Sequence, residues 1–169
     1  MEERRSREKV INLEVYTDGS LKKLGAKTFG GWSFIVLRDN QKVYEASGSE
    51  YDTTNQRMEL EAIRQALKYV STIRRINEKV MIYSDSAYAI NCYTQAWYLK
   101  WMYNGWVNAN KKTVSNQDLW IDIIPYFDSF WYGFKKVDGH SNVFWNEVCD
   151  KMAQKEAETL KIKWRGKNE

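Results

Sequence analysis

Several residue types that mark particular protein classes are scarce in this chain. Only two of its 169 residues are cysteine and only one is proline. Two cysteines, Cys92 and Cys149, are too few for a disulfide framework or a thiolate metal site. No apolar run approaches the ~18 residues that a membrane span needs, and the mostly charged segment 1–9 excludes a secretory signal. We therefore expect a cytoplasmic protein that makes no use of membranes.

Aromatic residues, in contrast, are plentiful, at 15% of the chain with 8 Trp and 11 Tyr. This composition is typical of a packed fold and argues against disorder. The length fits one domain with a single core, which we predict over 10–160. A charged tail over 1–9 and a basic tail over 161–169, expected to be solvated and frayed, flank it. The net charge of +4 indicates a moderate attraction to nucleic acid.

Hydrophobic patterning predicts an α/β fold. Alternating apolar residues indicate a strand over 10–17, which Asp18-Gly19 is expected to stop. Further predicted elements are strands over 30–37, 42–49, 79–84 and 131–137, and helices over 55–71, from 86, within 98–112, over 116–127 and over 146–160. The first three strands should be antiparallel neighbours, and the last two, reached through helical crossovers, should run parallel to the first. The expected architecture is a five-stranded mixed sheet flanked by helices.

Two aspartates, Asp18 and Asp85, lie where predicted strands end. Ligands bind at this edge of open α/β sheets, so the position favours a functional role. Turn chemistry explains an aspartate before Gly19 equally well, and capping of the following helix competes as the explanation for Asp85. Position alone leaves both alternatives open.

Glu59 is better distinguished from an ordinary surface acid. It lies one turn before Ile63 on the face of its predicted helix that turns toward the core. Glu61 falls instead with Arg64 and Lys68 on the face expected to be solvated. The helix dipole favours acids in a first turn, but it does not require the inward face. We therefore favour a functional role for Glu59.

The last candidates lie near the C-terminal helix. Asp150 shares a stripe with Asn146, Ala153 and Ala157, small residues suited to close packing against another element. A structural partner such as an arginine would also explain this acid. His140, the only histidine, precedes the helix in a polar loop. Such a histidine is commonly incidental, but its place makes it a candidate for proton transfer.

The four acids require compensation wherever folding buries them together, because burying an unpaired charge is expensive. Carboxylate oxygens are hard ligands. The natural candidates for the compensating cation are therefore Mg²⁺ or Mn²⁺.

Six short segments, in register, resemble the type 1 ribonuclease H family over about residues 10–160. They are Tyr16-Thr17-Asp18-Gly19-Ser20, Thr53-Thr54-Asn55-Gln56-Arg57-Met58-Glu59-Leu60, Ser84-Asp85-Ser86, Asn104-Gly105-Trp106, Asn116-Gln117-Asp118-Leu119-Trp120, and Gly139-His140-Ser141 leading to Asn146-Glu147-Val148-Cys149-Asp150. Any one string is weak evidence, but six in this order are very specific. The family's fold, a five-stranded mixed sheet with flanking helices, agrees with the pattern.

The resemblance implies endonucleolytic cleavage of the RNA strand of an RNA–DNA hybrid, giving 5′-phosphate and 3′-hydroxyl products. It implies that Asp18, Glu59, Asp85 and Asp150 hold two Mg²⁺ ions around the scissile phosphate. His140 matches a loop histidine that the family links to proton transfer or product release.

Substrate contacts are also implied by the resemblance, since only RNA offers a 2′-hydroxyl to be recognised. The matching residues are Asn55 and Gln56 for the minor groove, the backbone of Gly19 and Ser20 for ribose, Thr54 and Asn116 for a DNA-strand phosphate, and Trp106 for a deoxyribose. Thr54 or Asn55 can also serve as the cap of the helix over 55–71, and both roles are compatible. For Trp97, Trp101 and Trp120 we expect helix packing instead.

The chain departs from the family pattern at two places. Segment 22–29 lacks the asparagine that many relatives carry there, and Ala87 stands where glutamine is often found. The region 98–112 is also less basic than in strongly binding members. We therefore expect ordinary chemistry with modest affinity for the hybrid.

Three interpretations follow. The leading one is a stand-alone, monomeric hybrid nuclease without an additional hybrid-binding domain, because only nine residues precede the first strand. The second is a domain detached from a reverse transcriptase or mobile element. The third is an inert hybrid-binding module, which four intact carboxylates argue against.

Overall fold

Five strands form one mixed sheet in the computed structural model, which describes residues 11–137 and 144–168. The strands are β1 (Ile11–Leu24), β2 (Lys27–Arg38), β3 (Gln41–Tyr51), β4 (Glu78–Ser84) and β5 (Tyr132–Lys136), in the order β3-β2-β1-β4-β5. The first three are antiparallel neighbours, whereas β4 runs parallel to both β1 and β5. The predicted topology is confirmed.

The length of β1 differs from the prediction, because Asp18-Gly19 does not stop it. Parallel pairing with β4 ends at Tyr16 and Tyr83, but antiparallel pairing with β2 continues to the pair Leu24–Lys27. The hairpin turns at Gly25, whose φ of 59° suits glycine. Asp18 therefore lies within a strand, just past the end of the parallel segment, and the turn explanation for it is wrong.

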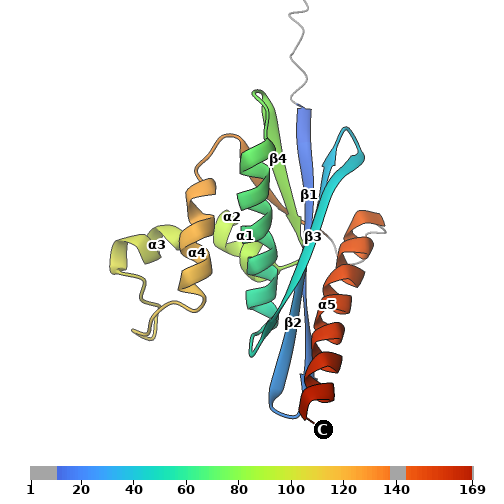
Figure 1. Cartoon of the computed structure of the whole chain (residues 1–169). Helices are drawn as coiled ribbons and strands as arrows, with labels where there is room; N and C mark the ends of the chain where they lie inside the picture. Colours follow the sequence, from blue (N-terminus) through green and yellow to red (C-terminus); the bar gives the residue numbers. More distant parts are fainter. Residues whose placement is uncertain (1–10, 138–143, 169) are drawn as a thin grey trace, which may run out of the picture.

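Helices cover both faces of the sheet (Figure 1). One face carries α1 (Asn55–Ile73), beside which lie α2 (Ala87–Thr94), α3 (Trp97–Asn104), α4 (Gln117–Ile123) and a short 3₁₀ turn (Ile124–Tyr126). The other face carries α5 (Phe144–Asn168), packed against β1, β2 and β3. Among the described residues, no helix has the length and apolar character needed to cross a membrane.

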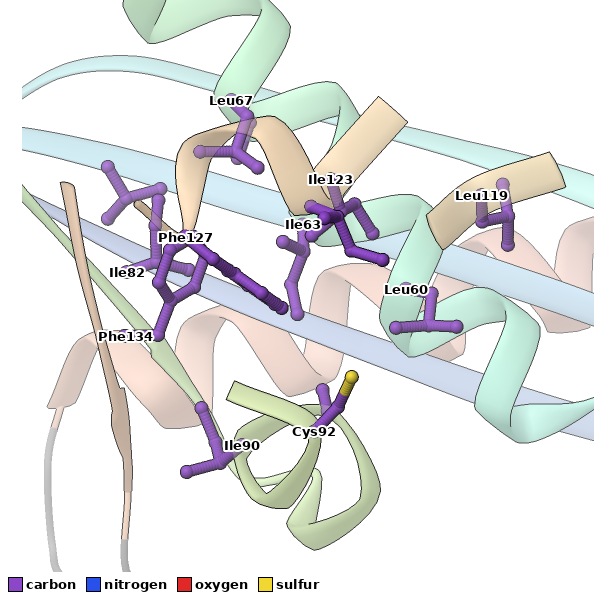
Figure 2. Close-up of a cluster of buried hydrophobic side chains, with 14 of the residues drawn as sticks. Leu60, Ile63, Leu67, Ile82, Ile90, Cys92, Leu119, Ile123, Phe127 and Phe134 are labelled. Atoms are coloured by element: carbon purple, nitrogen blue, oxygen red, sulfur yellow. The ribbon is translucent and has the colours of Figure 1, made fainter. Parts of the chain in front are cut away.

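The main core lies between the sheet and the helices of the α1 face. Figure 2 shows side chains from α1, α2, α4, β4 and β5 converging there, including Leu60, Ile82 and Phe134. Trp120 is fully buried in this core, as expected from its helical position. A smaller cluster, with Tyr16 and Cys149, fills the space between the sheet and α5.

Helix caps decide two alternatives that the sequence left open. Thr54 caps α1, since its Oγ1 accepts a hydrogen bond from the Arg57 amide at 3.1 Å. Ser86 caps α2 in the same way, at 3.1 Å from the Ala89 amide, so Asp85 has no capping role. Asn116 precedes α4 in a left-handed conformation (φ 63°) and makes no side-chain cap.

The last helix is longer than predicted. It begins at Phe144 and continues to Asn168 instead of ending near Leu160, so the basic segment 161–168 is helical and the expected frayed tail is wrong there. Trp164 explains the extension, because its ring packs edge-on against Phe29 with centroids 5.9 Å apart. This tertiary contact supports helix where local sequence indicated fraying.

Small residues let α5 approach the sheet closely, as the stripe with Asp150 predicted. Ala153 and Ala157 are fully buried, and a Cβ added to Gly31 would lie 2.0 Å from the Ala153 carbonyl oxygen. This close packing fixes the position of α5, and with it Asp150, against β2.

Candidate active site

Three of the predicted acids converge from three elements. Asp18 on β1, Glu59 on α1 and Asp85 after β4 each offer a carboxylate oxygen, and these oxygens all lie within 4.8 Å of one another. The Thr17 hydroxyl donates to the Tyr83 carbonyl at 2.9 Å, which ties β1 to β4 next to the cluster. The arrangement gathers negative charge where the parallel strand pair ends.

A glycine next to Asp18 permits this convergence. A Cβ on Gly19 would lie 2.4 Å from the Glu59 amide nitrogen and 2.6 Å from the Met58 carbonyl carbon. Such contacts are far below van der Waals distance, so only glycine lets the first turn of α1 rest on β1. Because Met58 is fully buried in the same turn, Glu59 is held toward Asp18.

Asp150 reaches the same region from the opposite face of the sheet. Its charge raises the pKa of both Asp18 and Asp85, which shows that it lies near them. One of its oxygens accepts a hydrogen bond from Gln154 Nε2 at 2.8 Å, where the sequence left an arginine partner open. His140, the fifth candidate, lies outside the described residues.

Burial and mutual repulsion shift the titration of the cluster. Burial raises the pKa of Asp18 to about 8, and the charge of Asp85 adds to this effect. A hydrogen bond from the Gly19 amide lowers the pKa and offsets part of the increase. Burial also raises the pKa of Glu59 to about 7, partly offset by a hydrogen bond from Ser86. Burial raises the pKa of Asp85 as well. Without a cation the site holds protons that ordinary carboxylic acids would release.

The donor set fits a hard divalent cation. All the convergent ligand atoms are carboxylate oxygens, the type that Mg²⁺ and Mn²⁺ prefer. In addition, Asp85 Oδ1 is buried and has no hydrogen-bond partner among the described residues. An unpaired buried carboxylate oxygen is costly, and a bound cation would remove that cost.

The pKa shifts predict how the stability of the metal-free protein depends on pH. The folded pKa of Asp18, about 8, exceeds its ordinary value of 3.8, so the folded state binds the proton more tightly. The stabilisation from this group is complete below about pH 4 and is lost as pH rises through 8. We expect Asp18→Asn to increase the free energy of unfolding in chelator at pH 8 and to leave it nearly unchanged at pH 4.

Urea unfolding of both proteins at the two pH values measures this difference. Adding Mg²⁺ at pH 8 should stabilise the wild type more than Asp18→Asn, because the cation replaces the protons. Equal unfolding free energies of the two proteins at pH 8 in chelator would contradict the predicted shift.

The residues matched to substrate contacts differ in how they relate to the cluster. Asn55 is exposed and donates from Nδ2 to Glu59 Oε1 at 3.2 Å, so it touches the site directly. Gln56 beside it is also exposed. Gly19 and Ser20 follow Asp18 along β1. Trp106 lies on the loop after α3, where its ring packs against Trp101 with centroids 6.0 Å apart.

Arg57 connects two residues that the sequence assigned to one phosphate pocket. Its amide bonds the Thr54 hydroxyl, and its guanidinium reaches Asn116 Oδ1 at 3.4 Å. The same guanidinium binds Asp118 through two hydrogen bonds of 2.9 and 2.8 Å. Sequence reasoning missed Arg57, because its partners lie about sixty residues away on another helix.

Two further residues were missed. Ser86 both caps α2 and hydrogen-bonds Glu59. Lys136 lowers the pKa of Asp85 from the end of β5. Lys136 could have been predicted near the site, because ligands bind where parallel strands end and Lys136 pairs with Ser84 at the end of β4. Glu61, in contrast, was placed wrongly: it is only 9% exposed and accepts hydrogen bonds from Arg64 and Gln65.

Together, the mixed sheet and its cluster of carboxylate oxygens define an α/β protein with an acidic site suited to a divalent cation. A model of the RNase H family matches residues 11–158. Ribonuclease H of Syntrophomonas wolfei is 42% identical over 146 residues, covering 86% of this chain and 96% of the relative. Ribonuclease H of Acetivibrio thermocellus is 40% identical over 144 residues, covering 85% and 93%. The chain therefore belongs to the ribonuclease H family, and it is an endoribonuclease.

Solved structures confirm the fold. LC9-RNase H1, a type 1 RNase H with the type 2 active-site motif, superposes with a TM-score of 0.74 at 23% identity, covering 88% of this chain and 73% of that one. A foamy viral protease-reverse transcriptase in complex with an RNA/DNA hybrid gives a TM-score of 0.77 at 22% identity, covering 88% and 20%.

Proposed function

We propose that this chain hydrolyses the RNA strand of RNA–DNA hybrids as a monomeric endonuclease, leaving 5′-phosphate and 3′-hydroxyl ends. The observation that carries the proposal is the convergence of Asp18, Glu59 and Asp85 within 4.8 Å in a member of the ribonuclease H family. The hybrid in the viral structural neighbour supports the same substrate class.

Asp18, Glu59, Asp85 and Asp150 are proposed to hold two Mg²⁺ ions, a role that Mn²⁺ can also fill. Bound ions of this kind activate the attacking water and stabilise the leaving 3′-oxygen in an in-line displacement. Asp18 lies on β1 and Asp85 directly after β4, whereas Glu59 and Asp150 come from helices on the two faces of the sheet, so folding itself fixes their relative positions. His140 is proposed to assist proton transfer or product release.

Recognition of the hybrid is assigned to the polar residues around the cluster. Asn55 and Gln56 are exposed at the start of α1 and are proposed to contact the minor groove, where RNA presents its 2′-hydroxyls. The Asn55 bond to Glu59 means that a minor-groove contact also touches a catalytic carboxylate. The backbone of Gly19 and Ser20 is proposed to contact the adjoining ribose.

The second strand is proposed to meet a separate pocket. Thr54 and Asn116, both hydrogen-bonded to Arg57, are proposed to offer a hydroxyl and an amide to a DNA-strand phosphate, while the Arg57 guanidinium is paired with Asp118. Trp106 is proposed to support a deoxyribose farther along. This division lets the sequence-independent backbone contacts position the duplex while Asn55 and Gln56 select it.

The direct test is cleavage of an end-labelled RNA–DNA hybrid in Mg²⁺, with matched double-stranded RNA and DNA as controls. We expect cleavage only in the RNA strand of the hybrid, and none in the presence of chelator. The product ends should carry a 5′-phosphate and a 3′-hydroxyl, which ligation of the products would test. Binding of the hybrid without cleavage would instead indicate an inert binding module. Cleavage of all three duplexes would contradict the proposed substrate selection.

A further inference from the structure

A basic groove adjoins the carboxylate cluster on the α5 side of the sheet. It has a volume of about 350 Å³ and lies between the extended end of β1 and the middle of α5, elements that run side by side in Figure 1. Its lining consists of Lys22, Lys151, Gln154, Lys155 and Glu158. Three lysines against one glutamate leave the groove with an excess of positive charge.

The lysines of this groove are available for a ligand. Among the described residues, no ion pair involves Lys22, Lys151 or Lys155. Lys27 and Lys42, elsewhere on the same sheet, are by contrast paired with acids. Lys22 is half-buried, which limits the volume that its ammonium group explores, whereas the two helix lysines are exposed.

The groove is joined physically to the catalytic cluster. Gln154, part of its wall, donates to Asp150 at 2.8 Å. A nucleic-acid strand that contacts Asp150 can therefore extend into the groove. The neighbouring phosphates of such a strand would otherwise face several clustered carboxylates, and unpaired lysines beside the cluster offset that repulsion.

We propose that Lys22, Lys151 and Lys155 form a subsite for a backbone phosphate of the cleaved RNA strand, beside the scissile phosphate. This inference rests on the proposed function, because it takes the RNA strand to lie at the carboxylates. The residues assigned to the DNA strand, Thr54 and Asn116, lie on the opposite face of the sheet from α5, which leaves the groove to the RNA strand.

Helix geometry limits how far the subsite reaches. Lys151 and Lys155 follow Asp150 by one and five residues, so they lie within a rise of about 7.5 Å from it along α5. A nucleic-acid strand advances about 3.4 Å per nucleotide along its axis. The phosphate bound in the groove should therefore lie within about three nucleotides of the scissile one.

The first measurement compares two triple variants in an Asp85→Asn background, by hybrid-binding titrations at several salt concentrations. The groove variant carries Lys22→Gln, Lys151→Gln and Lys155→Gln. The control variant loses the same charge through Lys42→Gln, Lys68→Gln and Lys79→Gln, which lie on β3, α1 and β4 and do not line the groove. We expect the groove variant to bind about fivefold more weakly and to lose about one unit of salt slope, with less than a twofold change in the control. Equal losses in both variants would overturn the subsite.

The second measurement identifies the strand and the position. Hybrids carry one uncharged methylphosphonate at successive linkages of the RNA strand, stabilised by a 2′-O-methyl group, or of the DNA strand. At one RNA linkage near the scissile bond, we expect the methylphosphonate to weaken hybrid binding by the protein that retains the three groove lysines. The same change should not affect hybrid binding by the groove variant. No such linkage, or one found only in the DNA strand, would overturn the proposal. If such an RNA linkage is found but the wild-type protein does not cleave hybrids, the subsite stands and the proposed function is refuted.

Discussion

Asp85→Asn should lower the rate of hybrid cleavage by at least about 10³-fold, which corresponds to about 4 kcal/mol of transition-state stabilisation. Asp85 lies in the carboxylate trio, and its Oδ1 is buried with no hydrogen-bond partner among the described residues. The substitution keeps the shape of the side chain but removes the negative charge that a divalent cation requires. Because Asp85 does not cap α2, the fold should survive the change.

Binding separates loss of chemistry from loss of substrate. Asp85 is not among the residues proposed to contact the hybrid, so the variant should bind hybrid within about threefold of the wild type, with catalysis prevented in both by chelator. Asp122→Asn is the matched control, because Asp122 pairs with Arg64 on the surface and stands apart from the trio. A wild-type cleavage rate for Asp85→Asn would mean that the metal centre is misassigned.

The sequence predicted the topology and the inward position of Glu59 from local rules, whereas the gathering of Asp18, Glu59 and Asp85 in one site was implied by the family resemblance. Antiparallel strands joined by short turns become neighbours, and helical crossovers make later strands parallel to the first. The inward position of Glu59 follows from its spacing to Ile63, and the structure places it against Asp18 and Asp85. For the topology and for Glu59 the local pattern carried enough information, whereas position alone left the roles of Asp18 and Asp85 open.

Features that depend on distant partners were not predictable. Asp18-Gly19 reads as a turn locally, but pairing of β1 with β2 carries the strand on to Leu24. The local sequence at the basic end of α5 indicates a frayed tail, but the Trp164 ring packs against Phe29 on β2. The helical pattern indicates a solvated Glu61, but its carboxylate is buried and accepts hydrogen bonds from Arg64 and Gln65. Tertiary contacts overrode the local pattern each time.

The carboxylate cluster also depends on a residue without a side chain, and Gly19→Ala tests that dependence. The new Cβ would lie 2.4 Å from the Glu59 amide nitrogen and 2.6 Å from the Met58 carbonyl carbon. Both atoms belong to backbone, so rotation of a side chain cannot relieve the contact. We expect α1 to shift away from β1, lowering the free energy of unfolding by about 3 kcal/mol and hybrid cleavage by about 10²-fold.

Gly166→Ala provides the control for this substitution. Nothing lies within 4 Å of a Cβ at that position, near the end of α5. Alanine there should stabilise the protein by ~0.5 kcal/mol through its helix propensity and leave cleavage unchanged. For Gly19→Ala, Mg²⁺ should also stabilise less at pH 8 than it does in the wild type, because Glu59 moves out of reach of Asp18. Wild-type stability and cleavage in Gly19→Ala would show that α1 does not rest on β1 at this point, and the close approach would then not be what brings Glu59 into the cluster.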